Sequence, residues 1–210
     1  MIFTPARLQD AVVIDVERRG DERGYLARTF CEHEFADHGL ITRSVQASTI
    51  FSRKRNTLRG LHFQKSPHAE VKLVRCTRGA ARVTIVDLRP ESGTYLRWLG
   101  VELSPENGRL LYVPKGFAQG YQTLMDDTEV AYQMSHEYVP EAASGVRWDD
   151  PAFGVEWPPA AEQRIISERD RAWPDYQPRP RPAPEGPPVQ PLRCSLDDRV
   201  GKARSRRDVG

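Results

Sequence analysis

The sequence contains few cysteines and no long apolar segment. Its three cysteines, Cys31, Cys76 and Cys194, are far apart, and none belongs to a CxxC pair. This pattern favours neither a disulfide framework nor a zinc site. No apolar run is long enough to span a bilayer, and the first residues show no cationic segment followed by an apolar one. We therefore expect a cytoplasmic protein with no membrane partner.

Charge is divided unevenly along the 210 residues, which carry a formal net charge of +2. From residue 178 to the end there are eight lysines and arginines against four acidic residues, so the first 177 residues are slightly acidic. A slightly acidic domain argues against nucleic-acid binding. Residues 178–210 are rich in proline and arginine, which predicts an extended or disordered tail. The predicted domain comprises residues 1–177.

Short segments with strand character, separated by Gly, Pro, Asn and Asp turns, dominate the first two thirds of the chain. Residues 71–77, for example, place Lys72, Val74 and Cys76 on one face of a strand. Such spacing is typical of an all-β sandwich or barrel. The other predicted strands are residues 11–16, 24–30, 43–51, 57–63, 81–88, 96–103, 109–113, 116–124 and 129–135.

The remaining segments have other characters. The charged stretch 17–24 is predicted to be a turn, and residues 31–40 a short helix closed by Gly39. The pattern becomes irregular after Tyr138. This irregular part is expected to pack back onto the sheets because it carries large aromatic side chains. They are Trp148, Trp157 and Trp173.

One stretch, TLRGLHFQKSPHAE at residues 57–70, concentrates groups suited to chemistry. It contains His62, and an imidazole group can titrate near neutral pH. Arg59 before it and Lys72 after it suit an anionic substrate. A single histidine in a strand is more often a hydrogen-bonded core residue, so the rest of the chain must supply its chemical partners.

A metal centre is one interpretation of this stretch, with His62, His68 and Glu70 as donors. The sequence has no HxH pair, however, and the later segment GFAQGY carries Gln119, a poor replacement for an imidazole ligand. We therefore predict no metal.

Proton transfer is the other interpretation, with His62 as the base. Asp170 would orient its ring, Lys72 would stabilise an oxyanion and Tyr132 would deliver a proton. Each partner also has an ordinary explanation. Tyr132 suits a core, Lys72 a solvated strand and Asp170 a cap or turn. Spacing alone does not choose between these explanations.

Six segments together carry a family resemblance. They are LRGLHFQ at 58–64, VKLVRCTRGAARVTIVDLRPESGTY at 71–95, YVPKGFAQGYQTL at 112–124, residues 132–138, GVRWDDPAFGVEWP at 145–158 and SERD at 167–170. In this order they resemble the dTDP-4-dehydrorhamnose 3,5-epimerase family, over about residues 1–176. The resemblance implies a metal-free and cofactor-free cupin-type jelly-roll barrel with short peripheral helices. It also implies a homodimer in which the partner's N-terminal strands help to line the site.

The resemblance implies roles for individual residues. His62 is expected to be the general base, Asp170 the carboxylate that orients it, Lys72 the cation that stabilises an enolate and Tyr132 the proton donor. The expected substrate is a nucleotide sugar, dTDP-4-keto-6-deoxyglucose, inverted at C3, C5 or both. Further expected contacts to it come from Tyr138, stacked on the base, from Arg23 and Arg59 at phosphate, and from Arg28, Gln46, Ser48, Gln119 and Arg169.

Four positions depart from the family's usual pattern. Gln119 replaces a histidine, Arg28 a glutamate and Ala143 another glutamate, while the usual QDN reads QAS at 46–48. None of these is an expected catalytic residue. The proton chemistry is therefore better supported than the identity of the nucleotide or the sugar.

Three alternative functions remain. The first is inversion at only one carbon, C3 or C5, including on another nucleotide sugar. The second is a 3,4-ketoisomerase on a similar barrel, whose histidine strand resembles RGxHAHK where this chain has RGLHFQK. The third is a non-catalytic barrel that binds nucleotide sugars, which the joint presence of the four expected catalytic residues disfavours.

The strand that carries His62 poses a geometric problem. In a regular strand Arg59 and His62 point to opposite faces. For both to meet one ligand, the strand must be irregular near Gly60, or the ligand must wrap around the strand's edge.

Overall fold

The computed structural model describes residues 1–160 and 162–182. Strands dominate these residues, which confirms the all-β prediction. The first sheet contains, in spatial order, β1 (Ile2–Pro5), β2 (Val12–Asp15), β10 (Leu110–Val113), β7 (Lys72–Arg78), β12 (Thr128–Met134) and β5 (Gln46–Ser52). The second contains β13 (Ala143–Gly145), β6 (Thr57–Gln64), β11 (Phe117–Thr123), β8 (Ala81–Asp87) and β9 (Trp98–Leu103), with β14 (Ile165–Ile166) paired to β6.

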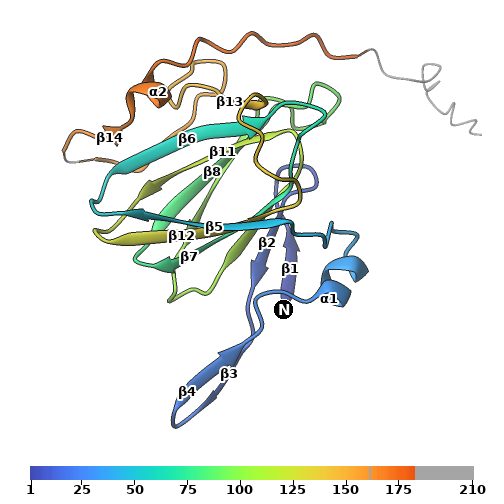
Figure 1. Cartoon of the computed structure of the whole chain (residues 1–210), viewed down its shortest axis with the longest axis vertical. Helices are drawn as coiled ribbons and strands as arrows, with labels where there is room; N and C mark the ends of the chain where they lie inside the picture. The colour runs from blue at the N-terminus through green and yellow to red at the C-terminus, as the bar shows by residue number, and fades with distance from the viewer. Residues whose placement is uncertain (161, 183–210) are drawn as a thin grey trace, which may run out of the picture.

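The two sheets form facing walls of a barrel. Figure 1 shows β6, β11 and β8 above β5, β12 and β7. Sheet neighbours are often distant in sequence, as β10 is from both β2 and β7, and these pairs are antiparallel. This is the arrangement of a jelly roll, so the cupin-type fold implied by the resemblance is confirmed.

The main core lies between the sheets and follows the period of two that the sequence predicts. Val74 and Cys76 of β7 are buried inside the barrel, whereas Leu73 packs in a separate cluster on the outer side of the first sheet. Burying an aliphatic side chain of this size stabilises the fold by about 1.5–3 kcal/mol. The alternation therefore fixes which residues of β7 face the interior.

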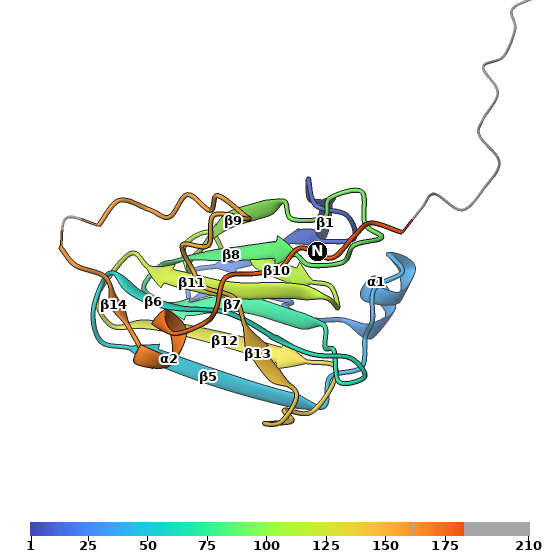
Figure 2. The same cartoon turned by 90° about the horizontal axis from the view of Figure 1, so that it is seen from above.

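The irregular C-terminal part covers the outer side of the second sheet, as predicted. Phe153 and Trp157 pack there against a cluster that includes Leu61 and Val86. The buried carboxylate of Asp150 anchors this part by accepting hydrogen bonds from the backbone N–H groups of Ala152 and Tyr176. Figure 2 shows α2 (Glu168–Arg171), which belongs to this part, beside β6.

Contacts with the barrel continue past the domain boundary predicted at residue 178, and that boundary stays a prediction. The backbone N–H of Arg179 donates a hydrogen bond to the hydroxyl of Tyr95 at 2.7 Å. The rest of the predicted tail, from residue 183, lies outside the described residues.

The helix α1 (Glu32–Asp37) lies where a helix is predicted, and Gly39 follows it with φ +69°. Neither helix in the described ranges is long and apolar enough to cross a membrane.

Residues 17–24, predicted to be a turn, instead form most of a hairpin. β3 (Arg18–Asp21) pairs with β4 (Gly24–Ala27), and the hairpin projects away from both sheets (Figure 1). The turn prediction was wrong for β3 because all four of its residues are exposed, so the sequence there lacks the apolar alternation that indicates a strand. Tyr25 and Leu26 of β4 are 58% and 75% exposed.

Candidate active site

A cavity of about 330 Å³ opens between the two sheets, a volume within the usual range for small-molecule sites. Its walls come from β6 and β11 on one side and from β5, β7 and β12 on the other, and α2 closes one edge. The ionisable groups that line it are Arg59, His62, Glu70, Lys72, Tyr121, Tyr132, Tyr138, Arg169 and Asp170.

An irregularity in β6 brings Arg59 and His62 into this cavity together. His62 lies opposite Gln119 of β11 and Arg59 opposite Tyr121, so β6 has one more residue than β11 between these pairs. Gly60 lies within the irregular segment and has φ +120°. Of the two solutions expected from the sequence, the strand takes the first, a local β-bulge.

Close packing makes glycine necessary at position 60. A Cβ atom there would lie 2.5 Å from Cα of Gly120 on the neighbouring strand. The positive φ adds a second penalty for any other residue. The spacing of Arg59 and His62 around the cavity thus depends on a residue that carries no functional group.

His62 and Asp170 form a close polar contact at the cavity, with 2.6 Å between His62 Nε2 and Asp170 Oδ1. Asp170 is buried, and its other oxygen accepts from the backbone N–H of Gly60 at 3.3 Å. When Nε2–H donates to the carboxylate, the neutral ring has its lone pair on Nδ1. The geometry can therefore fix the tautomer of a base.

The ionised form of Asp170 is stabilised by these contacts. Burial raises the pKa of the carboxyl group, but the hydrogen bond and charge of His62, the backbone N–H of Gly60 and the side chain of Ser167 together outweigh burial, so the pKa lies below its usual value. Ser167 caps α2 by accepting from the backbone N–H of Asp170 at 3.1 Å, which holds the carboxylate against β6.

Lys72 reaches the cavity from β7, and Glu70 contacts it there. The Nζ atom of Lys72 lies 2.9 Å from Glu70 Oε1. Both side chains are largely buried, with 11% and 4% of their surfaces exposed. Such a site keeps an ammonium group in a place where water screens charge poorly.

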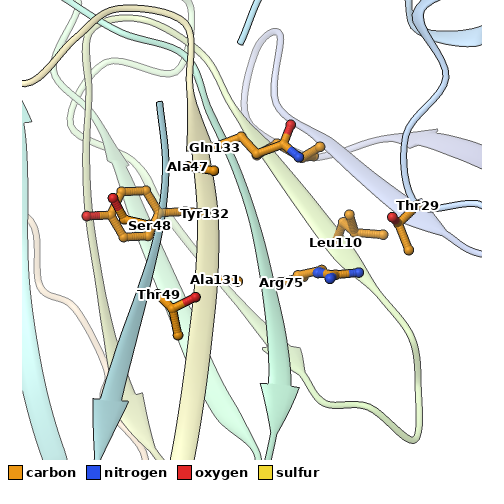
Figure 3. A pocket seen from close by; sticks show the side chains of 10 residues that line it. Thr29, Ala47, Ser48, Thr49, Arg75, Leu110, Ala131, Tyr132 and Gln133 are labelled. Atoms are coloured by element: carbon orange, nitrogen blue, oxygen red, sulfur yellow. The ribbon is translucent and has the colours of Figure 1, made fainter. Parts of the chain in front are cut away.

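Tyr132 belongs to the inward face of β12. Figure 3 shows its ring on the opposite side of the strand from Gln133. Gln133, Arg75 and Thr49 line a separate groove of about 250 Å³ on the outer side of the first sheet. Tyr132 lines both this outer groove and the cavity between the sheets. His62 and Lys72 line only the cavity between the sheets, so Tyr132 meets them there.

The rim of the cavity carries cationic and aromatic groups. The guanidinium of Arg169 lies 5.4 Å from the ring centroid of Trp173. Tyr138 is 52% exposed, and its backbone N–H donates to Gln46 Oε1 at 2.7 Å. Arginines and an exposed ring suit a ligand with phosphate and a flat base.

The comparisons with known proteins agree on one family. A family model described as dTDP-4-dehydrorhamnose 3,5-epimerase matches residues 5–177. The chain is 45% identical to the dTDP-4-dehydrorhamnose 3,5-epimerase of Methanothermobacter thermautotrophicus over 172 residues, which cover 81% of this chain and 92% of the relative. The chain belongs to the dTDP-4-dehydrorhamnose 3,5-epimerase family.

Solved structures give the same result. The Bacillus anthracis dTDP-4-dehydrorhamnose 3,5-epimerase with TDP and PPi bound is 36% identical to this chain, with a TM-score of 0.80. The match covers 83% of this chain and 99% of the Bacillus anthracis chain. The Legionella pneumophila epimerase in complex with dTDP-4-keto-L-rhamnose is 32% identical to this chain, with a TM-score of 0.77. The match covers 84% of this chain and 98% of the Legionella pneumophila chain. The family consists of isomerases, and the resemblance stated from sequence is confirmed.

The structure brings together eight of the residues predicted for the site and leaves four outside. The eight that line the cavity are Arg59, His62, Lys72, Gln119, Tyr132, Tyr138, Arg169 and Asp170. Arg23 lies at the tip of the hairpin and pairs with Asp21 at 2.6 Å, and Arg28 pairs with Glu34 at 2.8 Å. Ser48 lines the outer groove, and Gln46 supports the backbone of Tyr138.

The donors considered for a metal centre have separate partners. His62 contacts Asp170, Glu70 contacts Lys72, and His68 packs edge-on against His136 with ring centroids 5.1 Å apart. Sequence reasoning considered Glu70 only as such a donor and missed its contact with Lys72. The signal was present, because residues two apart in an extended segment can face the same side.

Proposed function

We propose that this protein inverts C3 and C5 of dTDP-4-keto-6-deoxyglucose, through proton abstraction and reprotonation. The contact between His62 and Asp170 carries the proposal, because it lies in the cavity that also contains Lys72 and Tyr132. These four side chains supply a base, its orienting carboxylate, a cation for developing negative charge and a second proton-transfer group.

Proton abstraction would begin at Nδ1 of His62. The 4-keto group acidifies the C–H bonds of the neighbouring carbons C3 and C5. His62 would take one of these protons, and the electron pair of the broken C–H bond would move onto the C4 oxygen as an enolate. Asp170 would stabilise the imidazolium that forms, without itself taking the proton.

Lys72 and Tyr132 would complete the inversion. The Lys72 ammonium would stabilise the enolate oxygen, and a single preorganised donor of this kind contributes on the order of 10²–10³-fold to turnover. Tyr132 would deliver its phenolic proton to the opposite face of the carbon. Exchange with water would then remove the proton from His62 and return one to Tyr132.

Recognition of the nucleotide would use the rim of the cavity. Arg59 and Arg169 suit the diphosphate, and the exposed ring of Tyr138 suits stacking on the base. Gln119 projects into the cavity opposite His62 and would contact the sugar.

The proposal includes a homodimer. The projecting hairpin exposes Tyr25 and Leu26, and its tip carries Arg23, which does not line the cavity of its own chain. In a dimer this hairpin would lie against the site of the second copy, where Arg23 could meet phosphate. Light scattering should give twice the chain mass of 23.9 kDa, and Leu26→Ser should shift the mass towards that of one chain.

Solvent exchange tests the reaction. Incubation of dTDP-4-keto-6-deoxyglucose with the protein in D₂O should place deuterium at C3 and C5, as followed by proton NMR. His62→Asn should slow labelling at both carbons by about 10²–10⁴-fold. His33→Asn, which changes an exposed histidine of α1, should label like the native protein.

The labelling pattern also separates the alternatives. Deuterium at C3 alone or C5 alone would assign a single-centre epimerase. If the native protein labelled neither carbon yet bound dTDP, the proposal would be replaced by a non-catalytic binding function.

A further inference from the structure

The environment of Lys72 contains a carboxylate that the proposed reaction does not use. Glu70 is buried, and one of its oxygens lies 2.9 Å from the Lys72 ammonium. Its other oxygen, Oε2, is buried and has no hydrogen-bond partner among the described residues. A buried carboxylate with one unsatisfied oxygen opposes folding unless other groups compensate. A contribution to stability therefore does not explain Glu70 well.

The backbone of Lys72 is held on both sides, but its side chain is not. Within the first sheet Lys72 pairs with Val113 of β10 and with Met134 of β12. The four-carbon side chain beyond this fixed point is flexible and ends in a group with three N–H donors. Glu70 is the acidic residue paired with that group.

We propose that Glu70 is a positioning residue that acts through Lys72, in a role that rests on the proposed function. The ion pair with Glu70, with 2.9 Å between Nζ and Oε1, restrains the ammonium group of Lys72. The restrained ammonium can then face the place where the C4 oxygen acquires negative charge. Preorganised donors stabilise a transition state because they need no reorientation when the charge develops.

The expected kinetic signature is a loss of kcat with little change in KM. The enolate charge exists in the transition state and not in the bound ketone, so an interaction with it affects kcat selectively. Glu70→Gln keeps the shape of the side chain but removes its negative charge, so the ion pair with Lys72 is replaced by a weaker contact with a neutral group. With dTDP-4-keto-6-deoxyglucose as substrate, we expect kcat to fall about tenfold and KM to stay within twofold.

A double-mutant cycle tests whether Glu70 acts through Lys72. Lys72→Met alone should lower kcat by on the order of 10²–10³-fold, and Glu70→Gln added to it should cause no further loss. Asp15→Asn is the matched control, because it breaks a pair of similar length with Arg109, at 2.8 Å, outside the cavity. It should retain native kcat.

Three results would overturn the proposal: native kcat in folded Glu70→Gln, an effect on KM alone, or losses that multiply in the double variant. Circular dichroism and thermal unfolding verify folding. If Glu70→Gln does not fold, Glu70→Asp, which withdraws the carboxylate by one methylene, takes its place in the same cycle. Failure of the proposed function is distinguishable, because the native protein would then not turn over the substrate or Lys72→Met would keep native kcat.

Discussion

Nε2 of His62 lies 2.6 Å from Oδ1 of Asp170, although the two residues are 108 positions apart in the chain. His62 belongs to strand β6, and Asp170 to a short helix that lies beside that strand. The base and its orienting carboxylate therefore depend on different parts of the fold, and each can be altered separately.

Asp170→Asn should lower kcat by about 10²–10⁴-fold, because the amide can favour the wrong tautomer of His62 and cannot stabilise an imidazolium. Steady-state turnover of dTDP-4-keto-6-deoxyglucose measures this loss. Asp150→Asn is the control. Asp150 is another buried aspartate, and its carboxylate accepts hydrogen bonds from the backbone N–H groups of Ala152 and Tyr176. This variant should lower the melting temperature and leave kcat of the folded protein near native. Equal kcat losses in the two variants would contradict the assignment.

The depressed pKa of Asp170 makes a contribution to stability that depends on pH. Its pKa in the folded protein lies below the ordinary value of 3.8, so the unfolded chain binds the proton more readily. The contribution is therefore present above about pH 3.8 and is lost as pH falls through the lower, folded-state pKa. The difference in unfolding free energy between native and Asp170→Asn, from denaturant titrations, should narrow below pH 3.8. A difference that widens on acidification would be inconsistent with this sign.

Tyr132→Phe should separate proton exchange from inversion. His62 remains and can return a solvent-derived proton to the face from which it removed one, but no phenol serves the opposite face. NMR in D₂O should detect labelled substrate of unchanged configuration and at least tenfold less inverted product. Inverted product at the native rate would assign the donor role to another residue.

Gly60→Ala should destabilise the fold and disturb the site together. The added Cβ would meet Cα of Gly120 at 2.5 Å, in a residue whose φ is +120°, and strain of this kind costs about 1–3 kcal/mol. Gly154 also has a positive φ, +58°, but its Cβ would meet nothing within 4 Å. Denaturant unfolding should therefore show a smaller loss for Gly154→Ala, and turnover should fall only in Gly60→Ala.

Cys76 should resist alkylation in the folded protein. Burial raises the pKa of its thiol to about 11, and the thiolate is the reactive form. At pH 8, iodoacetamide should modify Cys31, which is partly exposed, well before Cys76. Peptide mass spectrometry gives both rates, and rapid modification of Cys76 without denaturant would show that the barrel opens.

The sequence predicts best what depends on local alternation. The inward set of Val74 and Cys76 follows from a period of two, because burial selects one face of a strand. The hairpin strand at Arg18–Asp21 could not be predicted in this way, because it buries none of its residues.

The features of the site likewise differ in how far the sequence predicts them. The irregularity near Gly60 could be anticipated as one of two solutions, since Arg59 and His62 cannot share a face of a regular strand. The pairing of His62 with Asp170 was one interpretation of the residues, and the family resemblance, rather than spacing, favoured it over a cap or turn role for Asp170. Glu70 and Lys72 are two residues apart, so a shared side could be predicted, but the contact of their charged ends depends on side-chain conformations that the sequence pattern does not encode.

The position of α2 in the chain has a consequence for synthesis on the ribosome. Every strand of both sheets except β14 precedes residue 146, whereas Asp170 follows it. A nascent chain that stops before α2 contains the barrel strands with His62, Lys72 and Tyr132, but has no carboxylate to orient the imidazole. The proposed proton-transfer site is therefore completed only after the strands that carry His62, Lys72 and Tyr132 have been made.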